Sequence, residues 1–184
     1  MLVGDKKRLC LPLLAGFSLI VVLVSSAHAE TWDAWLARCR SWQDVESWMD
    51  AKFSYDQGRL ADVANWARGM KLQAPQTTFE KASGVCADAA LLCKHALNRI
   101  NSNYRAEVVH LNPGQGKLPH YVCAFFLDKR LHIMDYGTYV EATRGMFGPF
   151  DSLEEYVDLY CKRSGLDSLE GYGFGWMKVR PANR

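Results

Sequence analysis

One helix-forming stretch, followed at once by segments of strand type, constrains the fold of this chain more than any other feature. Between residues 85 and 100 the apolar residues recur at the period of a helix with one buried face. They are Ala89, Leu92, Cys93, Ala96, Leu97 and Ile100. Segments 105–111, 121–127 and 131–135 are rich in β-branched and aromatic residues, which is typical of strands. This order predicts an α+β fold, with the helix packed on an antiparallel sheet.

Aromatic residues dominate a segment that precedes this helix. Across residues 31–53, tryptophans and other apolar residues recur at helical spacing, which predicts one or two amphipathic helices. Ser41 is the expected cap of the second helix. We interpret the tryptophans as core packing, and a carbohydrate-binding surface is the alternative.

The other segments show weaker patterns. A short helix is predicted over residues 60–68, whereas residues 70–83 have no clear period and are predicted to be a loop. Ser152 and Glu155 form a capping-box pattern, which predicts a helix after them. A final strand is predicted over residues 176–179.

The first 29 residues have the pattern of an export signal. Lys6, Lys7 and Arg8 precede an apolar run over residues 9–24, and a small-x-small site ends at Ala29. The run is short for a membrane-spanning helix, although an uncleaved anchor is the alternative. We therefore expect a signal peptide over residues 1–29 and one domain over residues 30–184. The predicted location is periplasmic or secreted, with no stable membrane insertion after cleavage.

Composition excludes several classes of function. Hydrophobic residues make up 49% of the chain, which favours a globular domain. The formal net charge is only +2, and no basic block lies outside the signal and short pairs, so no nucleic-acid partner is expected. Asp128, Asp135 and Glu141 lack the spacing of a calcium loop, and neither a metal nor another cofactor is expected.

The cysteine count is odd once the signal, which contains Cys10, is removed. The remaining five are Cys39, Cys86, Cys93, Cys123 and Cys161. In an oxidising compartment one of them must stay free or pair outside the chain, and the other four allow up to two disulfides of undetermined pairing. This parity fits a catalytic cysteine without identifying it, and simple burial of several thiols is the alternative.

Cys86 is the candidate nucleophile, because it falls in the first turn of the predicted central helix. Unpaired N–H groups and the positive end of the helix dipole favour a negative charge at that position. Gly84, two residues earlier, allows close approach of backbone or substrate. A buried cysteine at a helix start is also common, so this position alone does not establish catalysis.

Hairpin geometry selects a histidine and a carboxylate to accompany the thiol. If segments 121–127 and 131–135 pair through a two- or four-residue loop, paired positions sum to 257 or 255. His120 then lies diagonal to Asp135 or directly opposite it, on the same face in both registers. His132 has the opposite parity to Asp135 and points away. The alternative for Asp135 is that it ends a strand and caps a turn.

Three short motifs resemble those of the transglutaminase-like superfamily. Gly84-Val85-Cys86-Ala87-Asp88-Ala89-Ala90 resembles its nucleophile motif, Pro119-His120-Tyr121-Val122 its histidine motif and Ile133-Met134-Asp135-Tyr136-Gly137 its aspartate motif. The HxW-like pattern of the superfamily is replaced here by His120-Tyr121-Val122. The resemblance spans about residues 54–139 and implies a papain-like core, with the cysteine on the helix and the other two residues on adjacent strands.

This resemblance implies acyl transfer through an acyl-enzyme on Cys86, with His120 as base and Asp135 as its orienting partner. We expect a peptidase or amidase that acts on a protein or peptide. Gln76 is the candidate oxyanion donor, with Gln73 and the Cys86 backbone N–H as other options. The alternatives are a crosslinking protein-glutamine transferase, a cell-wall peptidase of the NlpC type, whose typical Asp-Cys-Ser pattern is absent, and an inactive binding module.

Overall fold

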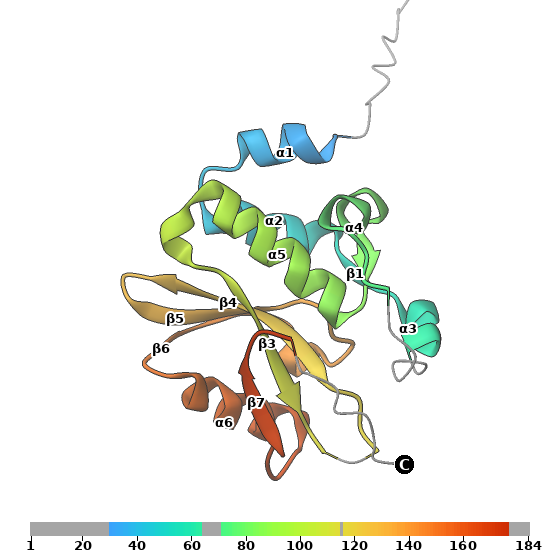
Figure 1. The fold of residues 1–184 in the computed structure, drawn as a ribbon, viewed down its shortest axis with the longest axis vertical. Coiled ribbons are helices and arrows are strands. Elements are labelled where there is room, and N and C mark those ends of the chain that lie inside the picture. Colours follow the sequence, from blue (N-terminus) through green and yellow to red (C-terminus); the bar gives the residue numbers. More distant parts are fainter. Residues whose placement is uncertain (1–29, 64–70, 115, 177–184) are drawn as a thin grey trace, which may run out of the picture.

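The computed structural model describes residues 30–63, 71–114 and 116–176 (Figure 1). The predicted signal peptide over residues 1–29 lies outside the described residues. Among the described residues, no helix has both the length and the apolar character needed to cross a bilayer.

The elements follow the predicted order of helices, sheet and small helix, and the fold is α+β as expected. The helices are α1 (Trp32–Arg38), α2 (Trp42–Lys52), α3 (Gln57–Val63), α4 (Pro75–Lys81), α5 (Cys86–Ile100) and α6 (Leu153–Ser164), with 3-10 turns at Ser102–Tyr104 and Glu141–Thr143. The strands are β1 (Ser54–Tyr55), β2 (Ser83–Gly84), β3 (Glu107–Asn112), β4 (His120–Leu127), β5 (Arg130–Asp135), β6 (Gly145–Phe150) and β7 (Gly171–Phe174). Five of these strands form an antiparallel sheet in the order β6-β5-β4-β3-β7, and β1 and β2 pair in parallel.

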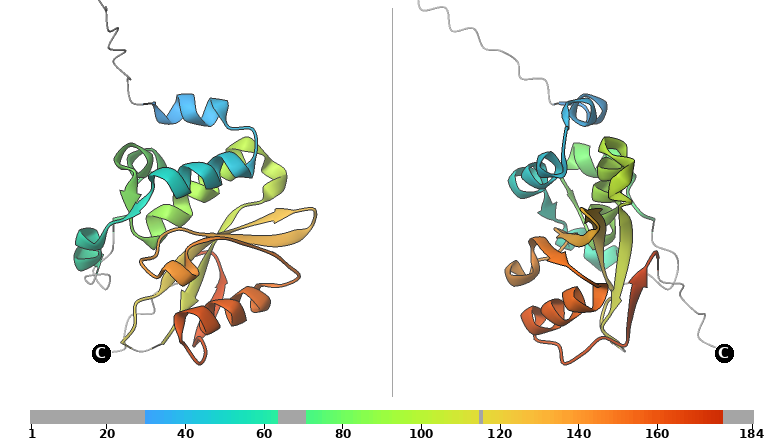
Figure 2. Two further views of the ribbon diagram at one scale, coloured as in Figure 1. Left: turned by 180° about the vertical axis from the view of Figure 1, so that it is seen from behind. Right: turned by 90° about the vertical axis from the view of Figure 1, so that its left-hand side faces the viewer.

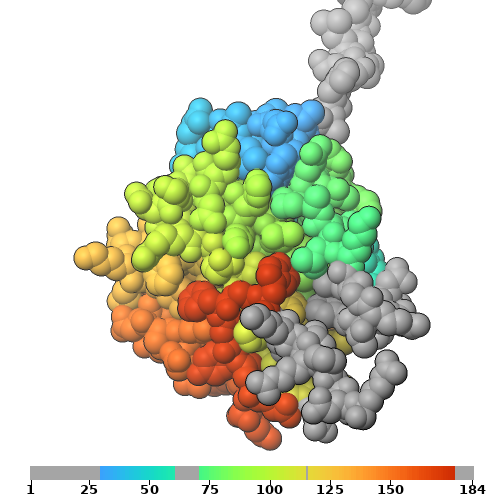
Figure 3. Space-filling view, viewed as in Figure 1, coloured from blue at the N-terminus to red at the C-terminus, as the bar shows by residue number. Residues whose placement is uncertain are grey.

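The sheet separates two apolar layers. Helix α5 lies across one face, and α6 packs against the other face (Figures 1 and 2). Along β4, Tyr121, Cys123 and Phe125 join the layer under α5, whereas Val122 and Ala124 join the layer under α6. This alternation follows from the two-residue period of a strand. Figure 3 shows that α5 and β7 occupy much of the same face of the molecule.

The N-terminal helices cover α5 through a cluster of aromatic rings. The ring of Phe79 on α4 lies 4.9 Å from the centroids of both Trp35 and Trp48. Trp32 and Trp35 are buried, so core packing is confirmed for these two side chains. Ser41 caps α2 as predicted, since its backbone N–H donates to Asp44 Oδ2 in a capping box.

The hairpin of β4 and β5 has the first of the two predicted registers. Leu127 pairs with Arg130, and Cys123 pairs with Met134, so paired positions sum to 257 (123 + 134). The two-residue turn consists of Asp128 and Lys129, which have φ values of +50° and +67°. Positive φ at both positions is the geometry of a type I′ turn, which matches the twist of the flanking strands.

Two segments that lack a strand-like sequence form the edges of the sheet. Strand β6 was not predicted, because Gly145, Gly148 and Pro149 interrupt it, and such residues are tolerated at an edge. The final strand is β7, earlier than the predicted residues 176–179, of which 177–179 lie outside the described residues. Its glycines alternate with aromatic residues, which obscured the pattern.

Two helix predictions need correction. Residues 75–81, predicted to be loop, form α4, with Pro75 in its first turn. Proline is favourable there because the first helical N–H needs no intrahelical partner. Helix α3 begins at Gln57, before the predicted start at residue 60, and residues 64–68 of that prediction lie outside the described residues.

Candidate active site

Cys86 is the first residue of α5, and only 6% of the residue is exposed. Gly137, which follows β5, packs directly on it, so that a Cβ at position 137 would overlap Cys86 Cα. A glycine is therefore required where the end of β5 meets the start of α5. This contact places the thiol next to the strand that carries Asp135.

Asp88 stabilises the first turn of α5. Its buried carboxylate accepts hydrogen bonds from the backbone N–H of Val85 at 3.1 Å and of Gln73 at 2.8 Å. The Arg59 guanidinium contributes a third contact, at 2.9 Å from Nε to Oδ2. The negative charge next to the helix N-terminus complements the helix dipole and fixes the backbone that carries Cys86.

His120 and Asp135 meet on neighbouring strands, on the face of the sheet covered by α6. The Nε2 atom of His120 lies 2.9 Å from each carboxylate oxygen of Asp135. The Asp135 side chain is fully buried, and that of His120 is 12% exposed. The predicted juxtaposition on one face of the hairpin is confirmed. Nδ1 is therefore the imidazole nitrogen that is available to exchange a proton with the Cys86 thiol.

The surroundings of His120 act on its protonation in opposite directions. Burial lowers the pKa of its imidazole, but the charge and hydrogen bond of Asp135 outweigh this and raise the pKa above the ordinary value. A hydrogen bond with the Cys86 side chain raises it further. The three predicted residues thus form one interacting group, in which Asp135 stabilises the positive charge that the imidazole carries once it has taken the thiol proton.

A cleft of about 360 Å³ gives access to this group. Cys86, His120 and Gly137 line its floor. Leu118 and Tyr139, which are 46% and 69% exposed, belong to its walls. A substrate entering the cleft would reach the thiol and the imidazole together, between walls that are mostly apolar.

Two tyrosines of α6 complete the surroundings and were not predicted. The Tyr156 hydroxyl donates to Asp135 Oδ2 at 3.2 Å. The Tyr160 ring stacks on the His120 imidazole, with centroids 5.5 Å apart and planes 11° from parallel. Their four-residue spacing indicated a shared helix face, but nothing in the sequence indicated which side of the sheet this face covers.

The prediction for Gln76 as oxyanion donor needs correction. Gln76 is exposed on α4, where its Nε2 donates to Glu80 Oε1 at 2.7 Å. The alternative, Gln73, is buried, but its Nε2 donates to Ser83 O at 3.1 Å and to Asp88 Oδ2 at 3.3 Å. Neither amide therefore points a free donor at the thiol. The backbone N–H groups at the start of α5 remain as candidate donors.

The other histidines and cysteines lie apart from this group. His132 points to the opposite face and packs against Phe125, as its parity predicted, and His95 is exposed on α5. All five cysteines of the described residues are free and buried, so neither of the two possible disulfides forms. Within the described ranges, no three His, Cys, Asp or Glu side chains gather as a metal site.

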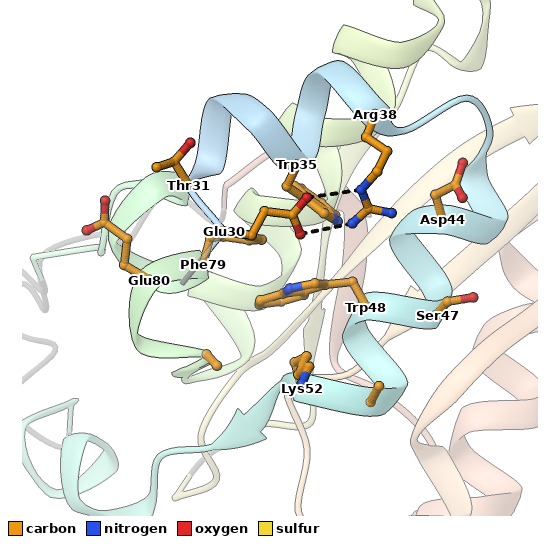
Figure 4. Close-up of a pocket in the computed structure, with 12 residues that line it drawn as sticks. Glu30, Thr31, Trp35, Arg38, Asp44, Ser47, Trp48, Lys52, Phe79 and Glu80 are labelled. Carbon is orange, nitrogen blue, oxygen red and sulfur yellow. Dashed lines mark hydrogen bonds and ion pairs between the residues drawn. The ribbon is translucent and has the colours of Figure 1, made fainter. Parts of the chain in front are cut away.

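A second, larger hollow of about 780 Å³ lies among the N-terminal helices (Figure 4). Trp35, Trp48 and Phe79 contribute apolar surface to it, and an ion pair of Arg38 with Glu30 crosses its rim. No cysteine or histidine is among the residues that line it. The cleft at Cys86 is therefore the one suited to nucleophilic chemistry.

Comparison with known families agrees with the fold. Residues 37–148 match the family described as a transglutaminase-like domain, which amounts to 112 of the 184 residues (148 − 37 + 1). The chain belongs to this family, whose members are cysteine hydrolases and transferases that act by acyl transfer. The matched segment contains Cys86, His120 and Asp135 and ends before α6. No curated protein shows significant similarity to the chain.

Proposed function

We propose that this protein is an exported cysteine peptidase or amidase with Cys86, His120 and Asp135 as its catalytic triad. The observation that carries the proposal is the contact of His120 with the buried Asp135 carboxylate, at a cleft that both His120 and Cys86 line. One imidazole nitrogen is held by a buried carboxylate, and the ring also interacts with a thiol at a helix N-terminus. This is the arrangement that activates a cysteine for attack on a carbonyl.

The first half-reaction forms an acyl-enzyme. His120 takes the thiol proton, and the Cys86 sulfur attacks the carbonyl carbon of an amide while the π electrons move to the oxygen. Backbone N–H groups at the start of α5 stabilise the resulting oxyanion. The carbonyl then re-forms, the C–N bond breaks, and His120 gives its proton to the leaving amine. Asp135 keeps the imidazole in the tautomer that these steps need.

Water completes the reaction. His120 removes a proton from a water molecule, whose oxygen attacks the thioester carbonyl. The C–S bond then breaks, the carboxylic acid leaves, and the sulfur recovers a proton from His120. An amine in place of water would make the protein a crosslinking transferase, with the same first half-reaction. Ammonia release and product mass, measured with and without an added primary amine, distinguish the two outcomes.

The proposed substrate is a protein or peptide, because the cleft is open and its walls are mostly apolar. The proposed location, periplasmic or secreted, rests on the sequence of residues 1–29. At that location the substrates would be extracytoplasmic proteins. We also propose that the protein has no nucleic-acid partner and is not stably inserted in the membrane after cleavage.

The test compares cells that express the wild type with cells that express Cys86→Ala, and it identifies extracytoplasmic proteins that remain uncut by mass spectrometry. We expect specific proteins to accumulate uncut with Cys86→Ala and with His120→Ala. The matched control, Cys161→Ala, removes a buried thiol of the other apolar layer and should behave as the wild type. Identical protein profiles for Cys86→Ala and the wild type would contradict the proposal and favour an inactive binding module.

A further inference from the structure

Helix α6 lies across the sheet from α5, yet two of its side chains touch the candidate triad. Tyr156 and Tyr160 are separated by four residues and thus lie one above the other on one face of α6. This face covers the side of the sheet to which His120 and Asp135 project. The group that reacts with substrate is therefore enclosed by α5 at one side and by α6 at the other.

Tyr156 makes an asymmetric contact with the Asp135 carboxylate. The carboxylate is fully buried, and a buried charge needs polar partners. His120 Nε2 is equidistant from the two oxygens, at 2.9 Å, so it does not by itself select one rotation of the carboxylate. The Tyr156 hydroxyl donates to Oδ2 alone, at 3.2 Å, and this asymmetric contact fixes the rotation.

Tyr160 stacks on the imidazole of His120. Its ring lies almost parallel to that of His120, at 11°, and it also lines the cleft. Stacking limits rotation of the imidazole about its Cβ–Cγ bond, because any tilt would separate the faces or drive the rings together. With Nε2 held by Asp135, a fixed plane also fixes the direction in which Nδ1 points.

We propose that α6 is an integral part of the active site, in which Tyr156 and Tyr160 are positioning residues that act on Cys86 through Asp135 and His120. The inference rests on the proposed function. Both tyrosines lie beyond residues 37–148, so the family segment alone does not contain the complete site of this protein. The competing explanation is that both are ordinary core residues, whose removal affects stability only.

The test uses the full chain and iodoacetamide, whose iodide is displaced by the sulfur of a deprotonated thiol. The readout is the rate of Cys86 carboxamidomethylation, measured by mass spectrometry of the peptide that contains it. Tyr156→Phe keeps the ring and removes one hydroxyl, and we expect the rate to fall about tenfold, since a hydrogen bond to a charged group is lost. The matched control is Tyr172→Phe, which removes a surface hydroxyl that donates to Glu154, and its rate should equal that of the wild type.

A double-mutant cycle with His120→Ala separates positioning from a structural role. If Tyr156 acts through His120, Tyr156→Phe changes the rate in the wild type but not in the His120→Ala background. Equal effects in both backgrounds, or a wild-type rate in folded Tyr156→Phe, would overturn the proposal for Tyr156.

For Tyr160, the ring is what stacks on His120. Tyr160→Leu should therefore slow the reaction, and Tyr160→Phe should restore most of the lost rate. Equal rates for Leu and Phe at this position would overturn the proposal for Tyr160.

The same data separate this inference from the proposed function. If Cys86 in the wild type reacts no faster than in His120→Ala, the triad itself is absent, and the proposed function fails. If the wild type reacts fast and His120→Ala slowly, while the two α6 variants match the wild type, only the role of α6 fails.

Discussion

Asp135 is a buried carboxylate whose surroundings leave it little freedom. It accepts from His120 and from Tyr156, and no part of its side chain is exposed. A charge in this position costs solvation that only such contacts can offset. The benefit is a histidine whose orientation and protonation are set before a substrate arrives.

Replacing Asp135 by Asn tests this residue directly. The amide keeps the shape but removes the charge, and it can present an N–H where the imidazole Nε2 needs an acceptor. We expect Asp135→Asn to lower amide hydrolysis, and iodoacetamide reactivity of Cys86, by about 10²- to 10⁴-fold, the range typical of general-base contributions. The control is Asp151→Asn, whose carboxylate pairs with Arg130 at the surface. Unchanged reactivity of Asp135→Asn would contradict the triad.

The raised pKa of His120 predicts a pH dependence of folding stability. The folded state retains the proton above the ordinary pKa of 6.5, at which the unfolded chain releases it. The stabilisation is therefore complete below that pH and is lost as the pH rises toward the folded pKa, at no more than about 1.4 kcal/mol per pH unit. Urea unfolding of Cys86→Ser and of Cys86→Ser/His120→Gln, compared from pH 6 upward, measures it. We expect the difference between the two to shrink as the pH rises, and a constant difference would exclude the raised pKa.

At the scale of elements, the close approach of β5 and α5 depends on Gly137. A methyl group at this position would overlap the Cys86 backbone, so the end of the strand or the start of the helix must move. We expect Gly137→Ala to cost about 1–3 kcal/mol of unfolding free energy, as overpacked sites do, and to slow Cys86 alkylation as well. The control is Gly171→Ala on β7, where an added Cβ meets nothing within 4 Å. If Gly137→Ala matches this control in both measurements, the contact does not position the thiol.

The edge strands show that the position of a strand in the sheet determines which residues it tolerates. The central strands β4 and β5 are buried along almost their whole length because both faces of the sheet are covered. Strands β6 and β7 hydrogen-bond along only one side to the rest of this sheet, so glycine and proline cost them less. For the same reason their sequences resembled loops, and neither was predicted where it lies.

In the molecule as a whole, the aromatic cluster packs the N-terminal helices against α5, the helix that carries Cys86. Trp35 is 1% exposed and contacts the rings of Trp32, Trp48 and Phe79. We expect Trp35→Ala to lower the free energy of unfolding by about 3–5 kcal/mol, the cost of removing a buried aromatic ring. Trp176→Ala is the control, because Trp176 is 40% exposed and its ring contact is worth about 1 kcal/mol. Chemical denaturation followed by far-UV circular dichroism measures both, and equal losses would contradict this role of the cluster.

The site residues could be predicted from the sequence only where the geometry of a single helix or hairpin fixes their positions. Cys86 was found because the apolar stripe fixes the start of its helix, and His120 and Asp135 because a hairpin register decides which side chains share a face. The prediction of Gln76 as oxyanion donor was wrong because residues 75–81 were predicted to be a loop. They form helix α4, which directs the Gln76 amide toward solvent.

Residue spacing was enough to predict two parts of the site: the central helix that carries the thiol, and the hairpin that brings an imidazole to a carboxylate. These follow from spacings of a few residues, which act through the backbone geometry of one helix or one strand pair. Two other features could be seen only in the folded chain: α6 covers the far side of the site, and Gly137 contacts the start of α5. Such contacts join segments that are distant along the chain, and the packing of whole layers, not a local spacing, brings them together.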